Sequence, residues 1–125
     1  MQKILIVDDE EKIRRIYRSL LAIERYEVMD ARDGNIATDC LAKDPNINLV
    51  LLDINMPQLN GVALYEIIRH NHPRVKVIVT SAYPLEDQKV LILRAEDYYD
   101  KSQGTDILLQ KVKRALGEPK IGEMP

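Results

Sequence analysis

The sequence predicts an α/β fold in which helices cover both faces of a parallel β-sheet. Short apolar runs that are typical of buried strands alternate along the chain with stretches in which apolar residues recur at helical spacing. The strand-like runs are continuously apolar, as expected for parallel strands that are buried on both faces. The chain has 125 residues, of which 46% are hydrophobic and 30% are charged, and this composition fits one globular domain.

Two strands and two helices are predicted in the first third of the chain. Residues 4–7 (ILIV) are rich in β-branched side chains and are bounded by charge, so they are expected to form a buried strand. Apolar residues between positions 13 and 21 recur at the spacing of one helical stripe. A weaker strand follows at residues 26–31, and residues 36–41 carry a second helical stripe that Asp44-Pro45 ends.

The middle of the chain continues the alternation. Residues 49–52 (LVLL) form the second strongly apolar run and predict the third strand. After Met56-Pro57 and a turn at Asn60-Gly61, apolar residues within 64–68 predict the third helix, which ends at His72-Pro73. Residues 75–79 form the next apolar run and predict the fourth strand.

The last predicted helices differ in how clearly the sequence indicates them. Residues 85–94 are ambiguous because 90–93 (VLIL) are apolar all round, and the alternation of elements is what predicts a helix there. A short strand is expected at residues 97–99. A final helix is expected over residues 108–116, with Gly117 just past its end.

Composition argues against several classes of function. The net charge of −2 does not favour general binding to nucleic acid or to an anionic membrane. Cys40 is the only cysteine, so an internal disulfide and a thiolate metal cluster are excluded, and a lone thiol fits the cytoplasm. No apolar run is long enough for a secretory signal or a membrane span. We expect one domain at residues 1–117, with 118–125 as a tail or the start of a linker and no DNA-binding domain.

Polar residues follow four of the predicted strands. Asp8-Asp9 follow the first strand, Asp53 the third, Thr80-Ser81 the fourth and Lys101 the fifth. Because ligands of an open parallel sheet bind beyond the carboxyl ends of its strands, these side chains are expected to meet at one edge. Three crowded carboxylates either raise their pKa values or bind a cation, and oxygen-only ligands suit Mg²⁺.

Such a site could accept a phosphoryl group on a carboxylate. Asp53 is the natural nucleophile because it follows the most apolar strand, and its attack on phosphorus gives an aspartyl phosphate. A bound cation would shield Asp53 from the negative charge of its target. Thr80 could hydrogen-bond one phosphoryl oxygen and Lys101 could pair with another.

In these segments the sequence resembles the receiver domain of two-component response regulators. The resemblance covers residues 2–117. The matching segments are residues 4–10 (ILIVDDE), 49–57 (LVLLDINMP), 60–61 (NG), 77–83 (VIVTSAY) and 95–101 (AEDYYDK). Each segment alone is a weak signal, but their order and spacing together are highly specific.

The resemblance implies a flavodoxin-like fold, a (βα)5 three-layer sandwich whose parallel five-stranded sheet has the order 2-1-3-4-5. It implies that Asp53 accepts a phosphoryl group from a histidine of a sensor kinase or of a phosphotransfer protein. The chain would then be a signalling switch rather than a turnover enzyme, and would catalyse only its own phosphorylation and dephosphorylation.

The resemblance also implies a metal site. Asp9 and Asp53 would ligate Mg²⁺ (or Mn²⁺), with Asp8 close by, often through water. The backbone carbonyl of Asn55 would complete the protein ligands.

A conformational switch is implied as well. Thr80 would be the switch hydroxyl, Lys101 the phosphate-pairing lysine and Tyr98 the aromatic switch residue. In the family the hydroxyl moves toward the phosphoryl group, the ring turns inward, and the face made by the fourth helix, fifth strand and fifth helix changes. That face is also a candidate for homodimer contact, which Leu91→Asp or Ile92→Asp is expected to weaken.

Two residues depart from the family pattern. Ser102 follows Lys101 where the family usually has proline after a cis peptide, so this bond is expected to be trans or a strained cis bond. Arg94 stands where the family often has glycine, and an altered end of the fourth helix is expected.

Three other functions remain as alternatives. A receiver-shaped docking module that is never phosphorylated is one. A metal-dependent phosphatase of the haloacid-dehalogenase kind is another, but it needs a second acid at the position of Asn55, which cannot give up a proton in this way. A flavodoxin is disfavoured because the acidic residues 8–11 (DDEE) would repel the flavin phosphate.

Several singled-out residues have structural explanations. Tyr98 and Tyr99 must point to opposite faces of a strand, so one of them is expected in the core. Cys40 is expected in the core because it lies on an apolar helical stripe. His70 and His72 are expected at the surface, without a metal role.

Overall fold

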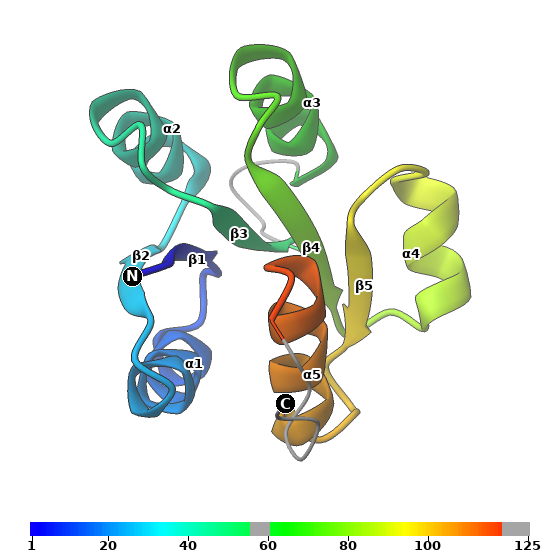
Figure 1. The fold of residues 1–125 in the computed structure, drawn as a ribbon. Coiled ribbons are helices and arrows are strands. Elements are labelled where there is room, and N and C mark those ends of the chain that lie inside the picture. Colours follow the sequence, from blue (N-terminus) through cyan, green and yellow to red (C-terminus); the bar gives the residue numbers. More distant parts are fainter. Residues whose placement is uncertain (56–60, 119–125) are drawn as a thin grey trace.

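The computed structural model describes residues 1–55 and 61–118 and shows a five-stranded sheet in the order β2-β1-β3-β4-β5, with every neighbouring pair parallel (Figure 1). The strands are β1 (Lys3–Val7), β2 (Glu27–Ala31), β3 (Leu49–Asp53), β4 (Lys76–Ser81) and β5 (Asp97–Asp100). The helices are α1 (Glu11–Ile23), α2 (Gly34–Lys43), α3 (Gly61–Asn71), α4 (Leu85–Leu91) and α5 (Thr105–Ala115). The predicted α/β class and strand order are confirmed. Met56-Pro57, Asn60 and the tail from Pro119 onward lie outside the described residues.

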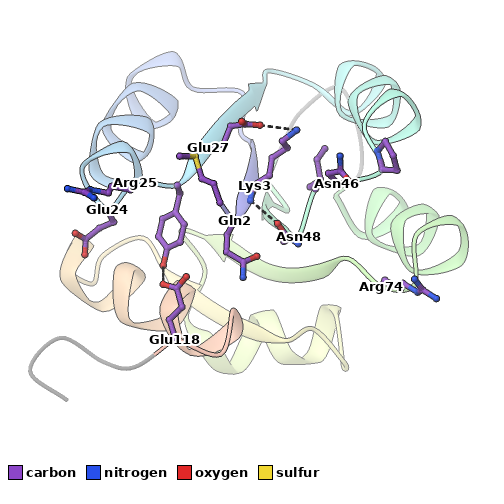
Figure 2. Close-up of a pocket in the computed structure, with 13 residues that line it drawn as sticks. Gln2, Lys3, Glu24, Arg25, Glu27, Asn46, Asn48, Arg74 and Glu118 are labelled. Carbon is purple, nitrogen blue, oxygen red and sulfur yellow. Dashed lines mark hydrogen bonds and ion pairs between the residues drawn. The ribbon is translucent and has the colours of Figure 1, made fainter. Parts of the chain in front are cut away.

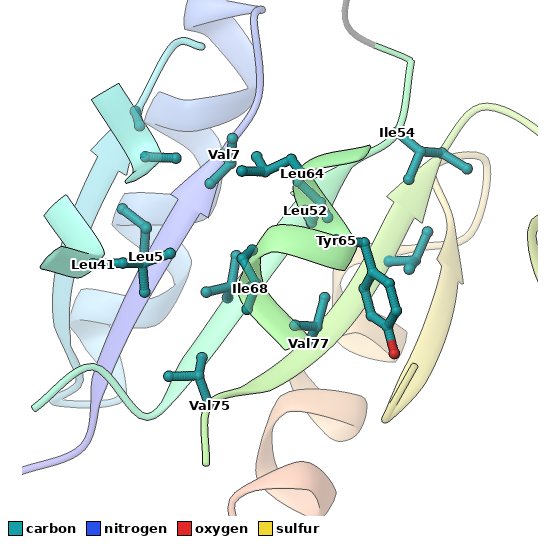
Figure 3. Close-up of a cluster of buried hydrophobic side chains, with 14 of the residues drawn as sticks. Leu5, Val7, Leu41, Leu52, Ile54, Leu64, Tyr65, Ile68, Val75 and Val77 are labelled. Carbon is teal, nitrogen blue, oxygen red and sulfur yellow. The ribbon is translucent and has the colours of Figure 1, made fainter. Parts of the chain in front are cut away.

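The sheet is the middle of three layers, with α1 and α5 on one face and α2 and α3 on the other, while α4 packs beside β5 (Figure 1). Alternate residues of each strand enter different apolar clusters, so that Leu5 and Val7 face α2 and α3 while Ile4 and Ile6 face α1 and α5. Figure 3 shows the first cluster, in which Leu64 and Ile68 of α3 cover the sheet. Burial on both faces explains why the strands are continuously apolar.

The register brings the carboxyl ends of the strands together. Val7 of β1 pairs with Leu52 of β3, so Asp8 and Asp53 follow at the same level. On the other side of β3, Asp53 pairs directly with Thr80 of β4. The edge where β1, β3 and β4 end therefore gathers the polar residues that the sequence singled out.

Helix α4 is shorter than the apolar pattern indicated. It ends at Leu91, and Ile92 is already extended with φ −132°. Of the run from Val90 to Leu93, only Ile92 is buried, whereas Val90 and Leu93 are 75% and 79% exposed. The surface of α4 thus carries exposed apolar residues, but Ile92→Asp would disrupt the core and cannot test a surface contact.

Three residues that were given structural explanations differ in their burial. His70 is exposed, as expected, and His72 is partly buried. Cys40 is partly buried and packs against the edge of the cluster between the sheet and α2.

Within residues 1–55 and 61–118, no helix is long and apolar enough to cross a bilayer.

Candidate functional site

Three carboxylates converge where β1 and β3 end. One carboxylate oxygen from each of Asp8, Asp9 and Asp53 lies within 4.8 Å of the other two. Asp8 and Asp53 are each only 1% exposed, whereas Asp9 is exposed. Neighbouring strand ends thus create a concentration of negative charge that an apolar sheet cannot solvate.

Lys101 supplies the nearest positive charge. Its Nζ donates to Asp8 Oδ2 at 2.8 Å and to Asp53 Oδ2 at 3.2 Å. The Lys101 side chain is 15% exposed, so one ammonium bridges two buried carboxylates at the edge of solvent. One cation against three carboxylates leaves a formal negative charge that would attract a further cation.

The protonation equilibria reflect this crowding. Burial raises the pKa of Asp53 and the charge of Asp8 raises it further, which outweighs the hydrogen bond from Asn55 and the attraction of Lys101. Burial by itself lowers the pKa of Lys101, but the hydrogen bond to Asp8 and the charge of Asp53 raise it overall. The lysine therefore stays charged while Asp53 is harder to ionise than a solvated carboxyl.

Local hydrogen bonds hold the acids in place. Asp53 Oδ1 accepts from the backbone N–H of Asn55 at 2.9 Å, and Asp8 Oδ1 accepts from the N–H of Glu10 at 2.9 Å. The guanidinium of Arg14 donates to the Asp8 carbonyl at 2.8 Å and pairs with Asp30 at 3.0 Å. Sequence reasoning missed Arg14, although its place one turn into the helix after Asp8-Asp9 is a usable signal.

Gly61 permits α3 to begin directly over the end of β3. A Cβ at this position would lie 2.4 Å from Ile54 Cα and 2.9 Å from the carbonyl oxygen of Asp53. Backbone atoms cannot yield to such contacts, so only glycine allows this approach beside Asp53.

The two hydroxyl residues at the end of β4 point to opposite faces. Thr80 pairs with Tyr99, which belongs to the cluster on the α1 and α5 side. By strand alternation Ser81 lies on the other face, together with Val79, whose partner is Tyr98. Thr80 is thus level with Asp53, whereas Ser81 shares the face of Tyr98.

One tyrosine of β5 was expected in the core, and the structure buries both, one on each face of the sheet. Tyr98 donates to the carbonyl of Ile92 at 2.6 Å and accepts from the N–H of Ala95 at 3.2 Å. Its ring therefore lies inward, against the end of α4. Tyr99 donates from its hydroxyl to the carbonyl of Gln103 at 2.7 Å.

The loop after β5 positions Lys101 without a proline. The described residues contain no cis peptide bond, so the Lys101–Ser102 bond is trans. The N–H of Lys101 donates to the Ser81 carbonyl at 2.8 Å, and the N–H of Ser102 donates to Asp100 at 2.9 Å. The side chain still reaches both buried acids, so the missing proline does not prevent the expected placement.

The donor set at this edge fits a hard divalent cation. Asp8, Asp9 and Asp53 offer only carboxylate oxygens, and one of the three is open to solvent. The exposed side of the group is where an ion could enter and keep part of its water shell.

A concavity lies at the opposite edge, where the strands begin (Figure 2). Its lining includes Lys3, whose Nζ pairs with Glu27 at 2.8 Å and with the neighbouring Asp44 at 2.6 Å. The side chains of Glu27 and Asp44 are 53% and 21% exposed, so water already compensates their charge without a ligand. The carboxyl edge is therefore the candidate site.

Comparison with known proteins agrees with this geometry. A family model described as the response regulator receiver domain matches residues 4–113. The transcriptional regulatory protein CpxR of Escherichia coli (strain K12) is 36% identical over 118 residues, which cover 93% of this chain and 50% of CpxR. The chain thus spans about half the length of this relative.

Solved structures give the same result. The response regulator TrrA of Thermotoga maritima, in complex with Mg²⁺ and BeF, matches with a TM-score of 0.84 and 35% identity over 92% of this chain and 99% of that one. TrrA in complex with the histidine kinase ThkA also matches, with a TM-score of 0.84 and 35% identity over 93% of this chain and 99% of that one.

Proposed function

This chain belongs to the response regulator receiver domain family, and on that basis we propose that Asp53 accepts a phosphoryl group in a divalent-metal-dependent reaction that switches the α4–β5–α5 face. The observation that carries the proposal is the convergence of Asp8, Asp9 and Asp53 within 4.8 Å, with Lys101 bridging two of them. A phosphorylated signalling switch, rather than a turnover enzyme, is the function that this arrangement supports.

The residues have distinct roles in this proposal. Asp9, Asp53 and the Asn55 carbonyl, with Asp8 beside them, would hold Mg²⁺ or Mn²⁺. The ion would neutralise the phosphoryl oxygens during transfer. Asp53 is the nucleophile, fixed by the Asn55 N–H, and Lys101 pairs with a phosphoryl oxygen after leaving one of its carboxylate partners.

Two residues are candidates for the switch hydroxyl. Thr80 was assigned this role by sequence, and its pairing with Asp53 supports it. Ser81 shares a face with Tyr98, the aromatic switch residue, and this position supports Ser81 instead.

The partner of this site is a histidine phosphodonor, on a sensor kinase or a phosphotransfer protein. The kinase complex of TrrA supports this part of the proposal. The exposed apolar residues Val90, Leu91 and Leu93 support a contact face at α4, where a homodimer or an effector would bind.

We place this function in the cytoplasm, without nucleic acid or membrane binding by this segment. A docking module that is never phosphorylated remains the alternative, whereas the phosphatase finds no support.

The central experiment is incubation with acetyl phosphate and Mg²⁺, followed by intact-mass analysis. The wild type is expected to gain one acid-labile phosphoryl group, and Asp53→Ala is expected to gain none. Asp44→Ala is the matched control, because Asp44 lies at the opposite edge of the sheet. No incorporation by the wild type would favour the docking module, and incorporation that survives Asp53→Ala would contradict the nucleophile.

The variants Thr80→Val and Ser81→Ala test which of the two residues supplies the switch hydroxyl. Both variants are expected to be phosphorylated, but only loss of the switch hydroxyl uncouples phosphorylation from the change at Tyr98, read by NMR of the Tyr98 ring. An unchanged Tyr98 response in Ser81→Ala, with a lost response in Thr80→Val, would return the role to Thr80.

A further inference from the structure

Gln88 is a fully buried polar residue with an unmet hydrogen-bonding group. It lies on α4 at 0% exposure, and its Oε1 is the one buried side-chain nitrogen or oxygen without a hydrogen-bond partner in residues 1–55 and 61–118. Buried polar atoms in native proteins are almost always paired, so this exception requires an explanation.

The other end of the same amide is fully used. Gln88 Nε2 donates to the carbonyl of Tyr83 at 2.8 Å and to the carbonyl of Tyr99 at 3.0 Å. Two carbonyl oxygens can only accept, so they determine which end of the amide faces them. The side chain therefore joins α4 to two separate segments, the loop after β4 and the strand β5.

Both segments lead directly to the acid site. The N–H of Tyr83 donates to Ser81 Oγ at 3.0 Å, and the N–H of Lys101, two residues after Tyr99, donates to the Ser81 carbonyl at 2.8 Å. Four hydrogen bonds and the main chain between Tyr99 and Lys101 thus join five residues in a ring: Ser81, Tyr83, Gln88, Tyr99 and Lys101. Lys101 connects this ring to Asp53, and Gln88 connects it to α4.

We propose that Gln88 is a positioning residue that passes a displacement of Ser81 to α4. The proposal rests on the proposed function with Ser81, rather than Thr80, as the switch hydroxyl, because a phosphoryl group on Asp53 is what would draw the Ser81 hydroxyl away. When that hydroxyl turns, the N–H of Tyr83 loses its acceptor, while Gln88 Oε1 already lacks a donor. The amide of Gln88 then exchanges its partners so that its Oε1 accepts from the N–H of Tyr83, which gives both groups a partner. The first turns of α4 move with the amide.

The exchange of hydrogen-bond partners by Gln88 also affects the exposed surface of α4, not the core alone. Gln88 is followed on α4 by Val90 and Leu91, which are exposed apolar residues. A change in the Gln88 amide therefore alters the orientation of an apolar surface that a partner could contact.

Hydrogen–deuterium exchange of peptides covering α4, with and without Mg²⁺ and beryllofluoride, tests the proposal. In the wild type the ligand changes exchange both in the loop 81–84 and in α4. In Gln88→Met, which keeps the length but has no donors, phosphorylation of Asp53 persists, and the ligand-dependent difference in α4 falls at least about threefold while that of the loop remains. Glu86→Met is the matched control, because Glu86 is exposed on the same helix.

The outcomes are distinguishable. A merely structural role would speed exchange equally in both states and leave the ligand-dependent difference intact, which would overturn the coupling. Absence of any phosphoryl group on the wild type would overturn the proposed function and the coupling with it. If Gln88→Met does not fold, NMR of the wild type decides: the Gln88 side-chain amide protons are expected to be protected and to shift when Mg²⁺ and beryllofluoride are added. Protons that do not shift would contradict the exchange of partners.

Discussion

At each edge of the sheet one lysine bridges two carboxylates, but the carboxylates differ in burial. At the carboxyl edge, Asp8 and Asp53 are buried and share one lysine, Lys101. At the amino edge, Lys3 pairs with two carboxylates that are less buried, those of Glu27 and Asp44. In both arrangements one lysine faces more than one carboxylate, but the surplus negative charge lies where water is scarce at the carboxyl edge and is solvated at the amino edge.

The difference shows where the fold gives up stability for function. Ion pairs near solvent contribute little, and their loss is tolerated. Buried carboxylates with too few partners oppose folding, and they persist where a ligand supplies the missing charge. A cation-seeking site is therefore recognised by its unmet electrostatic demand rather than by its number of charges.

The largest expected effect is that of Lys101→Met. Removing the ammonium that bridges Asp8 and Asp53 should lower the free energy of unfolding at pH 7 by about 2 kcal/mol, because two buried carboxylates lose this partner. Urea unfolding followed by circular dichroism measures it. Saturating Mg²⁺ should restore most of the loss.

Lys3→Met is the control for this variant at the amino edge. It should change stability far less than Lys101→Met and should show no dependence on Mg²⁺. Equal losses in the two variants would remove the distinction between the edges.

The next effect is that of Asp8→Asn on metal affinity. Loss of this carboxylate should weaken Mg²⁺ binding at least about tenfold by calorimetry, since a charged oxygen beside the ion becomes neutral. The same variant should lower the pKa of Asp53, because the charge of Asp8 is one of the causes that raise it. Asp44→Asn should leave Mg²⁺ binding unchanged, and equal affinity in Asp8→Asn would exclude Asp8 from the metal site.

The smallest effect is a difference in pH dependence between the edges. The pKa of Asp53 is raised in the folded state, so its stabilising contribution is present below its unfolded pKa of about 3.9 and is lost as pH rises through the folded pKa. The pKa of Asp44 is lowered, so its contribution is present above the unfolded pKa and is lost as pH falls through the folded pKa. Without metal, the stability differences of Asp53→Asn and Asp44→Asn from the wild type should therefore change in opposite directions with pH. Slopes of the same sign would contradict this assignment.

Much of the site was predictable because strand ends can be read from the sequence. Asp8-Asp9, Asp53 and Lys101 each follow an apolar run, and parallel strands bring their ends together. Ser81 was placed at this edge but was not predicted as a candidate switch hydroxyl, and Gln88 was not singled out at all. The face of a residue at the end of a strand depends on where the strand ends, and β4 continues through Ser81, beyond the apolar run that predicted it.

The sequence alone determined the alternation of elements, the α/β class and the identity of the acidic edge, because hydrophobic period and strand-terminal residues are local properties. Only the tertiary structure decided that Lys101 bridges two acids through a trans loop, that α4 ends at Leu91, and that Gln88 is buried with an unpaired oxygen. These features depend on which backbone groups from distant segments meet, and hydrogen bonding and burial are settled only when the layers pack.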